Sequence, residues 1–98
     1  MKIKFLQPAR YEFREAVRFY EQQQSGLGKE FRDEVIATIE RIQRFPFGFQ
    51  LLTDNIRRCQ TRKFPYGVIY ISKNNEIIII AVAHLHREPD YWESRIES

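Results

Sequence analysis

Four side chains in the segment AVAHLHREPDYW (residues 81–92) have the properties that phosphodiester chemistry needs: His84, His86, Arg87 and Tyr91. Histidine exchanges a proton near neutral pH, and the planar guanidinium group of arginine binds two phosphate oxygens at once. Metal-independent cleavage of RNA requires a base for the attacking 2′-hydroxyl, a proton donor for the leaving 5′-oxygen and positive charge for the phosphorane. The segment therefore contains the parts of such a site.

A block of basic residues precedes this segment. Between positions 55 and 75 the chain has no acidic residue and five cations: Arg57, Arg58, Arg62, Lys63 and Lys73. A run of positively charged side chains attracts a polyanion or an acidic protein partner. A solvated strand face is the alternative explanation, and the charge pattern leaves both open.

The candidate residues near the C-terminus also have structural explanations. His84 directly follows an apolar run, where a histidine at the edge of a core is common, and Tyr91 and Trp92 suit packing back over the sheet edge or the helical hairpin. Glu88 and Asp90 lie among the supposed catalytic cations, where their negative charge repels a phosphodiester. These two acids weigh against the nuclease interpretation.

Length and composition describe a single soluble domain over residues 1–98, with 43% hydrophobic and 14% aromatic residues and a net charge of +3. The longest apolar run, residues 77–83, has seven residues, whereas a membrane-spanning helix needs about 20. The N-terminus lacks the apolar stretch of a signal peptide. We therefore expect a cytoplasmic protein that does not contact a membrane.

The cysteine and histidine content limits the sites that the chain can build. One cysteine and two histidines exclude an internal disulfide and leave too few ligands for a closed zinc site. Cys59 lies at an inward position of its predicted strand, so we expect a small buried hydrophobic side chain there and not a nucleophile. We expect neither a metal ion nor a cofactor.

Hydrophobic periodicity predicts the elements that position these residues. Alternation indicates strands, and apolar stripes at helical spacing indicate two helices joined by a short glycine-containing connection. The predicted order is strand, helix, helix and three strands, over residues 1–6, 8–23, 27–42, 56–64, 68–72 and 76–83. Residues 44–55 are expected to form a connection that seals one edge of the core, and residues 90–95 a short helix.

The order β-α-α-β-β-β predicts an α+β fold in which an antiparallel helical hairpin packs on one face of a small, mainly antiparallel sheet. The other face then has no second layer. Alternation places Cys59 toward the helices and Arg58 and Arg62 on the open face. Ile80 and His84 share a parity on the last strand, so we expect His84 to lie on the open face as well.

The segments RRCQTRKFPYGVIY (residues 57–70) and IIIIAVAHLHREPDYW (residues 77–92), together with the element order, resemble the RelE/ParE superfamily. Its members are the toxins of type II toxin–antitoxin modules and are often named plasmid stabilisation proteins. The resemblance covers nearly the whole chain. It implies a growth-inhibiting toxin that is neutralised by a cognate antitoxin protein encoded nearby, in a toxin–antitoxin hetero-oligomer or as a dimer.

Two activities occur in this superfamily. RelE-like members enter the ribosomal A site and cleave mRNA without a metal ion, and a catalytic set for that reaction would be Arg62, His84, Arg87 and Tyr91. ParE-like members bind DNA gyrase and carry out no nuclease chemistry. The sequence over residues 84–92 resembles ParE-like members more closely, so gyrase inhibition is the expected function and the endoribonuclease is the alternative.

Binding to the target or to the antitoxin calls for exposed charge and aromatic surface. The resemblance and the charge pattern together point to these residues: Arg57, Arg58, Arg62, Lys63, His86 and Trp92.

Overall fold

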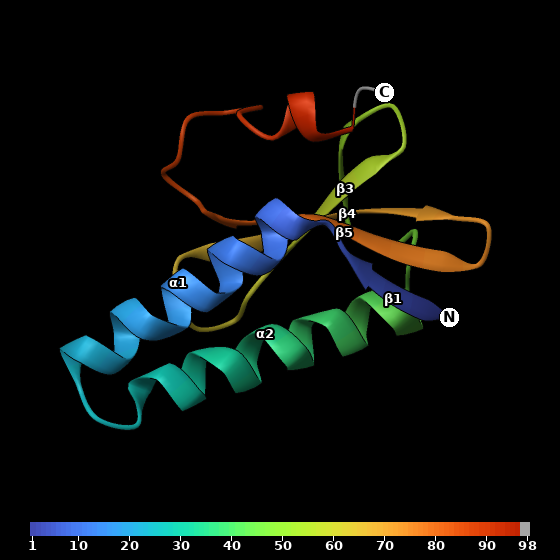
Figure 1. Ribbon diagram of the computed structural model, residues 1–98. Helices are drawn as coiled ribbons and strands as arrows, with labels where there is room; N and C mark the ends of the chain where they lie inside the picture. The colour runs from blue at the N-terminus through green and yellow to red at the C-terminus, as the bar shows by residue number, and fades with distance from the viewer. Residues whose placement is uncertain (97–98) are drawn as a thin grey trace.

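A computed structural model describes residues 1–96 and contains two helices, five strands and one 3₁₀ turn (Figure 1). In chain order the elements are β1 (Lys2–Phe5), α1 (Gln7–Gln23), α2 (Leu27–Arg44), β2 (Gln50–Thr53), β3 (Ile56–Gln60), β4 (Tyr66–Lys73), β5 (Glu76–His84) and the 3₁₀ turn η1 (Glu93–Arg95). Within residues 1–96, neither helix has the length and apolar character needed to cross a membrane.

The five strands form one sheet in the order β1-β5-β4-β3-β2. β1 pairs with β5 in parallel, and the other three neighbouring pairs are antiparallel. The helical hairpin covers one face of this sheet (Figure 1). The α+β class, the helical hairpin and the mainly antiparallel sheet are confirmed.

The hairpin forms because each helix has an apolar stripe and because the connection lets the helices approach closely. Gly28 lies at the contact, where a Cβ atom would be 2.7 Å from the carbonyl oxygen of Val17. The Glu21 carboxylate accepts hydrogen bonds from the backbone N–H groups of Gly26 and Gly28, at 3.1 and 3.0 Å. Glu21 therefore satisfies backbone donors at the start of α2 that have no partner within the helix.

Strand β2 is missing from the sequence-based prediction, which placed a connection over residues 44–55. Its four residues pair with β3, with Gln50 opposite Arg58, and the ladder is irregular between Leu51 and Thr53. So short a segment, with no alternation of apolar and polar residues, has no periodic signal of its own. The predicted C-terminal helix is also shorter than expected, because only Glu93–Arg95 form a helical turn.

The C-terminal segment covers the sheet face that lies away from the helices. The prediction that this face is open was therefore wrong. The segment after β5 crosses this face on the opposite side from the helices (Figure 1). Trp92 is the centre of the cover and is 2% exposed. It belongs to a second core cluster whose buried members also include Ile56, Ile69, Ile80, Ala81 and Ala83. The chain thus has one core on each face of the sheet.

A bulge in β5 corrects the expected position of His84. The β5 partners of Ile69 and Tyr70 are separated by one extra residue, Ile80, so the alternation of side chains reverses there. Ile80 belongs to the core under the C-terminal segment, whereas Val82 belongs to the core under the helices. His84 shares the parity of Val82 and therefore does not lie on the face predicted for it.

Candidate functional site

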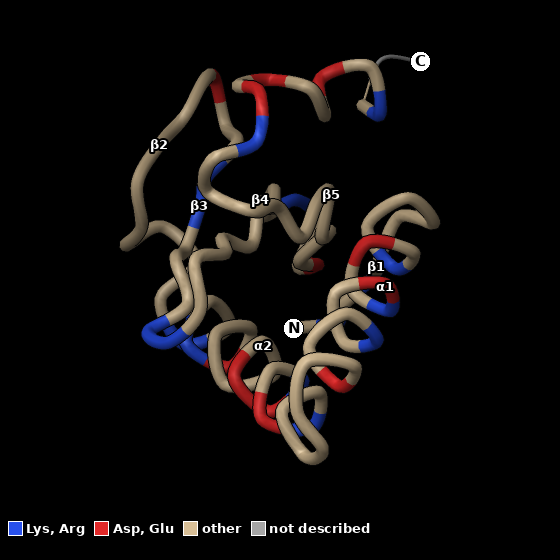
Figure 2. The backbone as a smooth tube through the Cα atoms, turned by 90° about the vertical axis from the view of Figure 1, so that its left-hand side faces the viewer, with Lys and Arg blue, Asp and Glu red and all other residues tan. Residues whose placement is uncertain are grey.

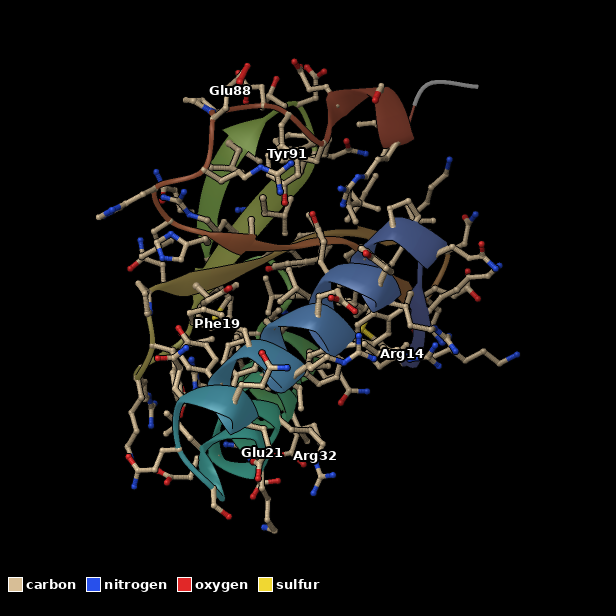
Figure 3. All side chains as sticks on the ribbon, turned by 60° about the vertical axis from the view of Figure 1, so that its left-hand side comes forward. Arg14, Phe19, Glu21, Arg32, Glu88 and Tyr91 are labelled. Atoms are coloured by element: carbon tan, nitrogen blue, oxygen red, sulfur yellow. The ribbon has the colours of Figure 1, made fainter. Side chains whose placement is uncertain are left out.

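The end of β5 and the segment after it bring several predicted residues together around a small cavity of about 130 Å³. His84, Arg87 and Tyr91 contribute to its lining, and so do Arg58 from β3 and the buried Trp92. Tyr91 points into the space between this segment and the sheet, whereas Glu88 projects outward (Figure 3). Three residues of the predicted catalytic set therefore share one neighbourhood.

His84 packs against Tyr66, its partner on β4, with ring centroids 5.2 Å apart. The backbone N–H of His86 donates a hydrogen bond to Nδ1 of His84 at 3.0 Å. Nδ1 is therefore an acceptor, and the proton of neutral His84 resides on Nε2. The side chain of His86 is exposed and its ring lies 5.3 Å from that of His84.

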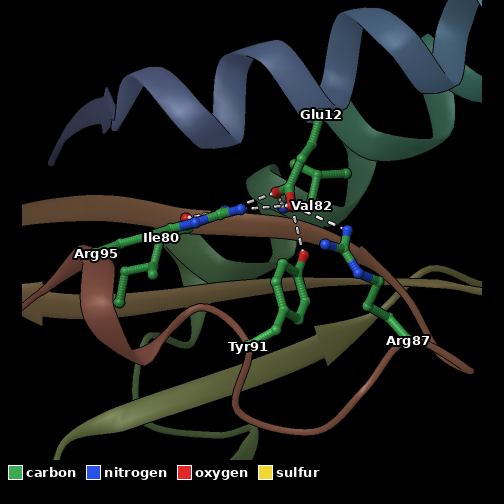
Figure 4. Close-up of polar contacts among 6 residues, drawn as sticks. All are labelled: Glu12, Ile80, Val82, Arg87, Tyr91 and Arg95. Carbon is green, nitrogen blue, oxygen red and sulfur yellow. Dashed lines mark hydrogen bonds and ion pairs between the residues drawn. The ribbon is translucent and has the colours of Figure 1, made fainter.

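Glu12 of α1, a residue outside the predicted set, is the centre of the polar contacts at this site (Figure 4). Its side chain is 13% exposed. Oε1 accepts a hydrogen bond from the backbone N–H of Val82 at 3.0 Å, and Oε2 accepts one from the Tyr91 hydroxyl at 2.6 Å. The Arg95 guanidinium donates to both oxygens, at 2.9 and 2.8 Å. An Arg87 nitrogen lies 3.9 Å from Oε2.

These contacts define the chemical state of Tyr91. Burial raises the pKa of its hydroxyl well above the usual range, and the hydrogen bond to Glu12 raises it further. The guanidinium of Arg87 stacks over the Tyr91 ring at 3.9 Å from the centroid, and Arg95 lies over it at 5.0 Å. At neutral pH the Tyr91 hydroxyl therefore stays protonated and donates a hydrogen bond to the Glu12 carboxylate.

Glu12 and Arg95 are the two residues of this site that sequence reasoning missed. The partners of Glu12 lie 70 to 83 positions away along the chain, and such pairing has no local pattern. One signal was available, because Glu12 falls within the apolar stripe that contains Ala9, Phe13 and Ala16. A carboxylate on the buried side of a helix needs a partner, since burying an unpaired charge is strongly unfavourable.

β3 lies at the other side of the sheet from β1. The alternation predicted for Arg58 and Cys59 is confirmed, but the strand ends at Gln60, so the expected place of Arg62 on the open face is wrong. Cys59 is 1% exposed in the core under the helices, and Arg58 lies on the opposite face beside the cavity. A guanidinium nitrogen of Arg58 donates to Oε1 of Gln50 at 2.9 Å. The stem of Arg58 crosses Gly67, where a Cβ atom would be 2.8 Å from its Cδ. Glycine at position 67 therefore makes room for this arginine.

Arg62 and Lys63 follow β3 and face the helical hairpin, away from the Glu12 contacts. The backbone N–H of Arg62 donates a hydrogen bond to Oε2 of Glu34 in α2. Lys63 borders a shallow depression together with Glu34, Glu30 and Asp33. Both helices carry charges of both signs (Figure 2). Arg62 is thus separated from the other three residues of the predicted catalytic set.

An exposed apolar surface adjoins the β2 edge of the sheet. Phe45, Phe47 and Leu51 are 60%, 68% and 50% exposed, respectively. The guanidinium of Arg57 lies over the Phe47 ring at 5.6 Å and donates to the carbonyl oxygen of Phe49 at 2.9 Å. We refer to Phe45, Phe47, Leu51 and Arg57 as the β2-edge surface. It combines apolar side chains, a cation and the edge strand β2, which are features of peptide-binding surfaces.

Comparisons with known proteins agree on one group. The family model described as "ParE toxin of type II toxin-antitoxin system, parDE" matches residues 3–89. A chain of the chromosomal ParDE TA system from P. aeruginosa superposes with a TM-score of 0.70 and 13% sequence identity, over 88% of this chain and 97% of that chain. The isolated E. coli RelE toxin superposes with a TM-score of 0.65 and 17% identity, over 96% and 94%. No curated protein matches the sequence.

Proposed function

Because the chain belongs to the ParE toxin family of type II toxin–antitoxin systems, we propose that it inhibits growth by binding DNA gyrase and that a cognate antitoxin neutralises it. Binding of this kind requires a complementary protein surface and no acid, base or phosphate clamp. Under this proposal the protein is an inhibitor that carries out no chemistry of its own. We propose that it acts in the cytoplasm.

The observation that carries this proposal is the set of contacts around Glu12. An RNA-cleaving site needs cations that are free to bind a phosphate and a group that gives up a proton near neutral pH. Here a carboxylate lies 2.6 Å from the Tyr91 hydroxyl and 3.9 Å from an Arg87 nitrogen. Its negative charge repels a phosphodiester from the place where the nuclease mechanism would need one. These contacts support a structural role for Tyr91 and a non-catalytic role for Arg87.

A RelE-like ribosome-dependent endoribonuclease is the second candidate. The likeness in fold to the E. coli RelE toxin favours it, and so does the position of His84 and Arg87 beside one cavity. Arg62 would have to act from the side of the sheet that faces α2, where its backbone contacts Glu34. The candidate therefore depends chiefly on His84 and Arg87.

We expect His84→Ala and Arg87→Ala to retain the growth arrest that the wild type causes, because neither side chain takes part in a reaction under the gyrase proposal. The measurement is colony formation after induction in the absence of antitoxin, together with primer extension on translated mRNA. Uncut messages and arrest by both variants are expected. Cuts inside codons with the wild type that disappear with either variant would establish the endoribonuclease instead.

The antitoxin contact is proposed to include the β2-edge surface. Arg57 gives this surface its positive charge and Arg58 follows it on β3, whereas Arg62 and Lys63 lie after the strand and face the helical hairpin. An acidic segment with apolar side chains is complementary to this combination in charge and in polarity. Trp92 does not contribute to such a surface in this conformation because it is 2% exposed, whereas the side chain of His86 is exposed.

Phe47→Ala is expected to weaken antitoxin binding by about 1–3 kcal/mol, the range for a central aromatic residue of an interface. Isothermal titration of the purified toxin with its cognate antitoxin measures this change. Phe19→Ala on α1 is the matched control, since Phe19 is 53% exposed but lies outside the β2-edge surface. An unchanged affinity for Phe47→Ala would exclude this surface from the contact.

A further inference from the structure

The groups that surround the Glu12 carboxylate form a complete set of donors for an oxyanion. A backbone N–H from β5, a hydroxyl from the segment after β5 and a guanidinium from η1 approach the two oxygens, all within 2.6–3.0 Å (Figure 4). Arg95 contacts both oxygens at once, in the fork geometry with which arginine also binds phosphate. Donors of these types bind negatively charged oxygen atoms. The oxygens can belong to a carboxylate side chain or to a free anion.

Within residues 1–96, Glu12 is the negative charge that faces Arg87 and Arg95. Arg95 is 16% exposed and Arg87 is 54% exposed, and both lie near the same carboxylate. Without Glu12 the two guanidinium groups would repel each other, and the partly buried Arg95 would lack a counter-charge. A small anion that entered would restore the balance.

Access to this place exists on the side of α1. A depression of about 460 Å³ borders Glu12 and is lined by Gln7, Pro8, Tyr11, Arg87 and Arg95. Its volume exceeds that of an inorganic phosphate ion, so a ligand of that size can reach Arg95 from solvent. Removal of the Glu12 side chain beyond Cβ would extend this space to the Tyr91 hydroxyl and to the N–H of Val82.

We infer that Glu12 fills an oxyanion-binding site formed by Val82, Tyr91 and Arg95, and that its carboxylate is the determinant that excludes inorganic phosphate from this site. The inference goes beyond the proposed function and holds for either cellular target. Glu12 then determines whether Arg87 and Arg95 contact a carboxylate of the chain itself or an anion from solution.

The test is phosphate binding by the full chain with Glu12→Ala. Thermal unfolding at pH 7 is followed in sodium phosphate and in sodium chloride at equal ionic strength, for the wild type, for Glu12→Ala and for Glu15→Ala. Glu15 is the control because it lies on the same helix and pairs with the exposed Arg18. We expect a saturable, phosphate-specific rise in the melting temperature of Glu12→Ala, corresponding to binding at least about ten-fold tighter than in the wild type, as expected for recovery of one charge-assisted hydrogen bond.

A double variant, Glu12→Ala with Arg95→Met, assigns the effect to the site, since it should lose the phosphate response. If Glu12→Ala is unfolded in chloride, circular dichroism in phosphate replaces the melting curve, and recovery of the folded spectrum in phosphate supports the inference. Equal phosphate responses in wild type, Glu12→Ala and Glu15→Ala would overturn it. Failure of phosphate to refold an unfolded Glu12→Ala would overturn it too. None of these results depends on growth arrest or on gyrase.

Discussion

Replacement of Glu12 with alanine lowers the free energy of unfolding by about 3–5 kcal/mol, the range for removing one partner of a buried ion pair. The loss is large because several donors lose their acceptor together. The N–H of Val82 and the hydroxyl of Tyr91 are left without a partner, and Arg95, 16% exposed, is left as an uncompensated charge. For a domain of this size the total stability is about 5–15 kcal/mol, so the variant is close to unfolding.

Urea denaturation in a chloride buffer measures this change for Glu12→Ala beside the control Glu15→Ala. Glu15 forms an exposed ion pair with Arg18, at 2.9 Å, and its removal should change the free energy of unfolding by less than about 0.5 kcal/mol. Similar small changes for both variants would show that the Glu12 contacts contribute little to the fold. The structural role assigned to Tyr91 would then lose its support.

Trp92→Ala is the second substitution with a large expected effect, a loss of about 3–5 kcal/mol. Trp92 is 2% exposed and fills the core between the C-terminal segment and the outer sheet face. Its removal leaves a cavity beside Ile69 and Ile80 and weakens the attachment of the segment that carries Tyr91 and Arg95. We therefore expect the C-terminal segment to detach from the sheet before the helical hairpin unfolds.

Hydrogen exchange of the amides in β5 and in residues 85–96, together with chemical denaturation, tests this expectation. The control is Phe45→Ala, which removes an aromatic side chain that is 60% exposed and should change stability by less than about 0.5 kcal/mol. Unchanged protection of residues 85–96 in Trp92→Ala would contradict the anchoring role.

Periodicity predicted the helical hairpin and the meander because both depend on local patterns. The stripes that contain Phe13 and Ala16 in α1, and Phe31 and Val35 in α2, face the sheet as expected. The alternation that placed Cys59 inside was also confirmed. In these elements the local preference of the sequence and the tertiary structure agree.

The position of His84 was predicted wrongly because alternation was extended across an irregular strand. The apolar run in β5 is hydrophobic at every position, so the sequence contains no sign of the bulge at Ile80. One inserted residue moves every later side chain to the other face. A strand with alternating polarity would have shown the change of parity directly.

The sequence analysis expected an open outer sheet face, and it predicted only that two aromatic residues of the C-terminal segment would pack back. Tyr91 and Trp92 were expected to pack back over the sheet edge or the helical hairpin, and Trp92 packs on the sheet. The sequence did not indicate that the same segment would meet Glu12 on α1, because Glu12 and Tyr91 are 79 positions apart. Contacts of this kind follow from the assembled fold and not from spacing.

The Glu12 contacts also connect stability with the proposed function. They attach the C-terminal segment to α1, and they place a negative charge among the cations that a nuclease would need. The endoribonuclease proposal requires these cations to act on a phosphodiester in the presence of that charge. The gyrase proposal requires only that the segment keeps its shape.

Supercoiling of a relaxed plasmid by purified gyrase, with increasing amounts of this protein, tests the central proposal most directly. We predict that the wild type inhibits supercoiling, that His84→Ala inhibits equally well, and that the cognate antitoxin restores the reaction. Full supercoiling at a large molar excess of folded wild-type protein, which nevertheless arrests growth, would contradict the account and leave the ribosome as the target.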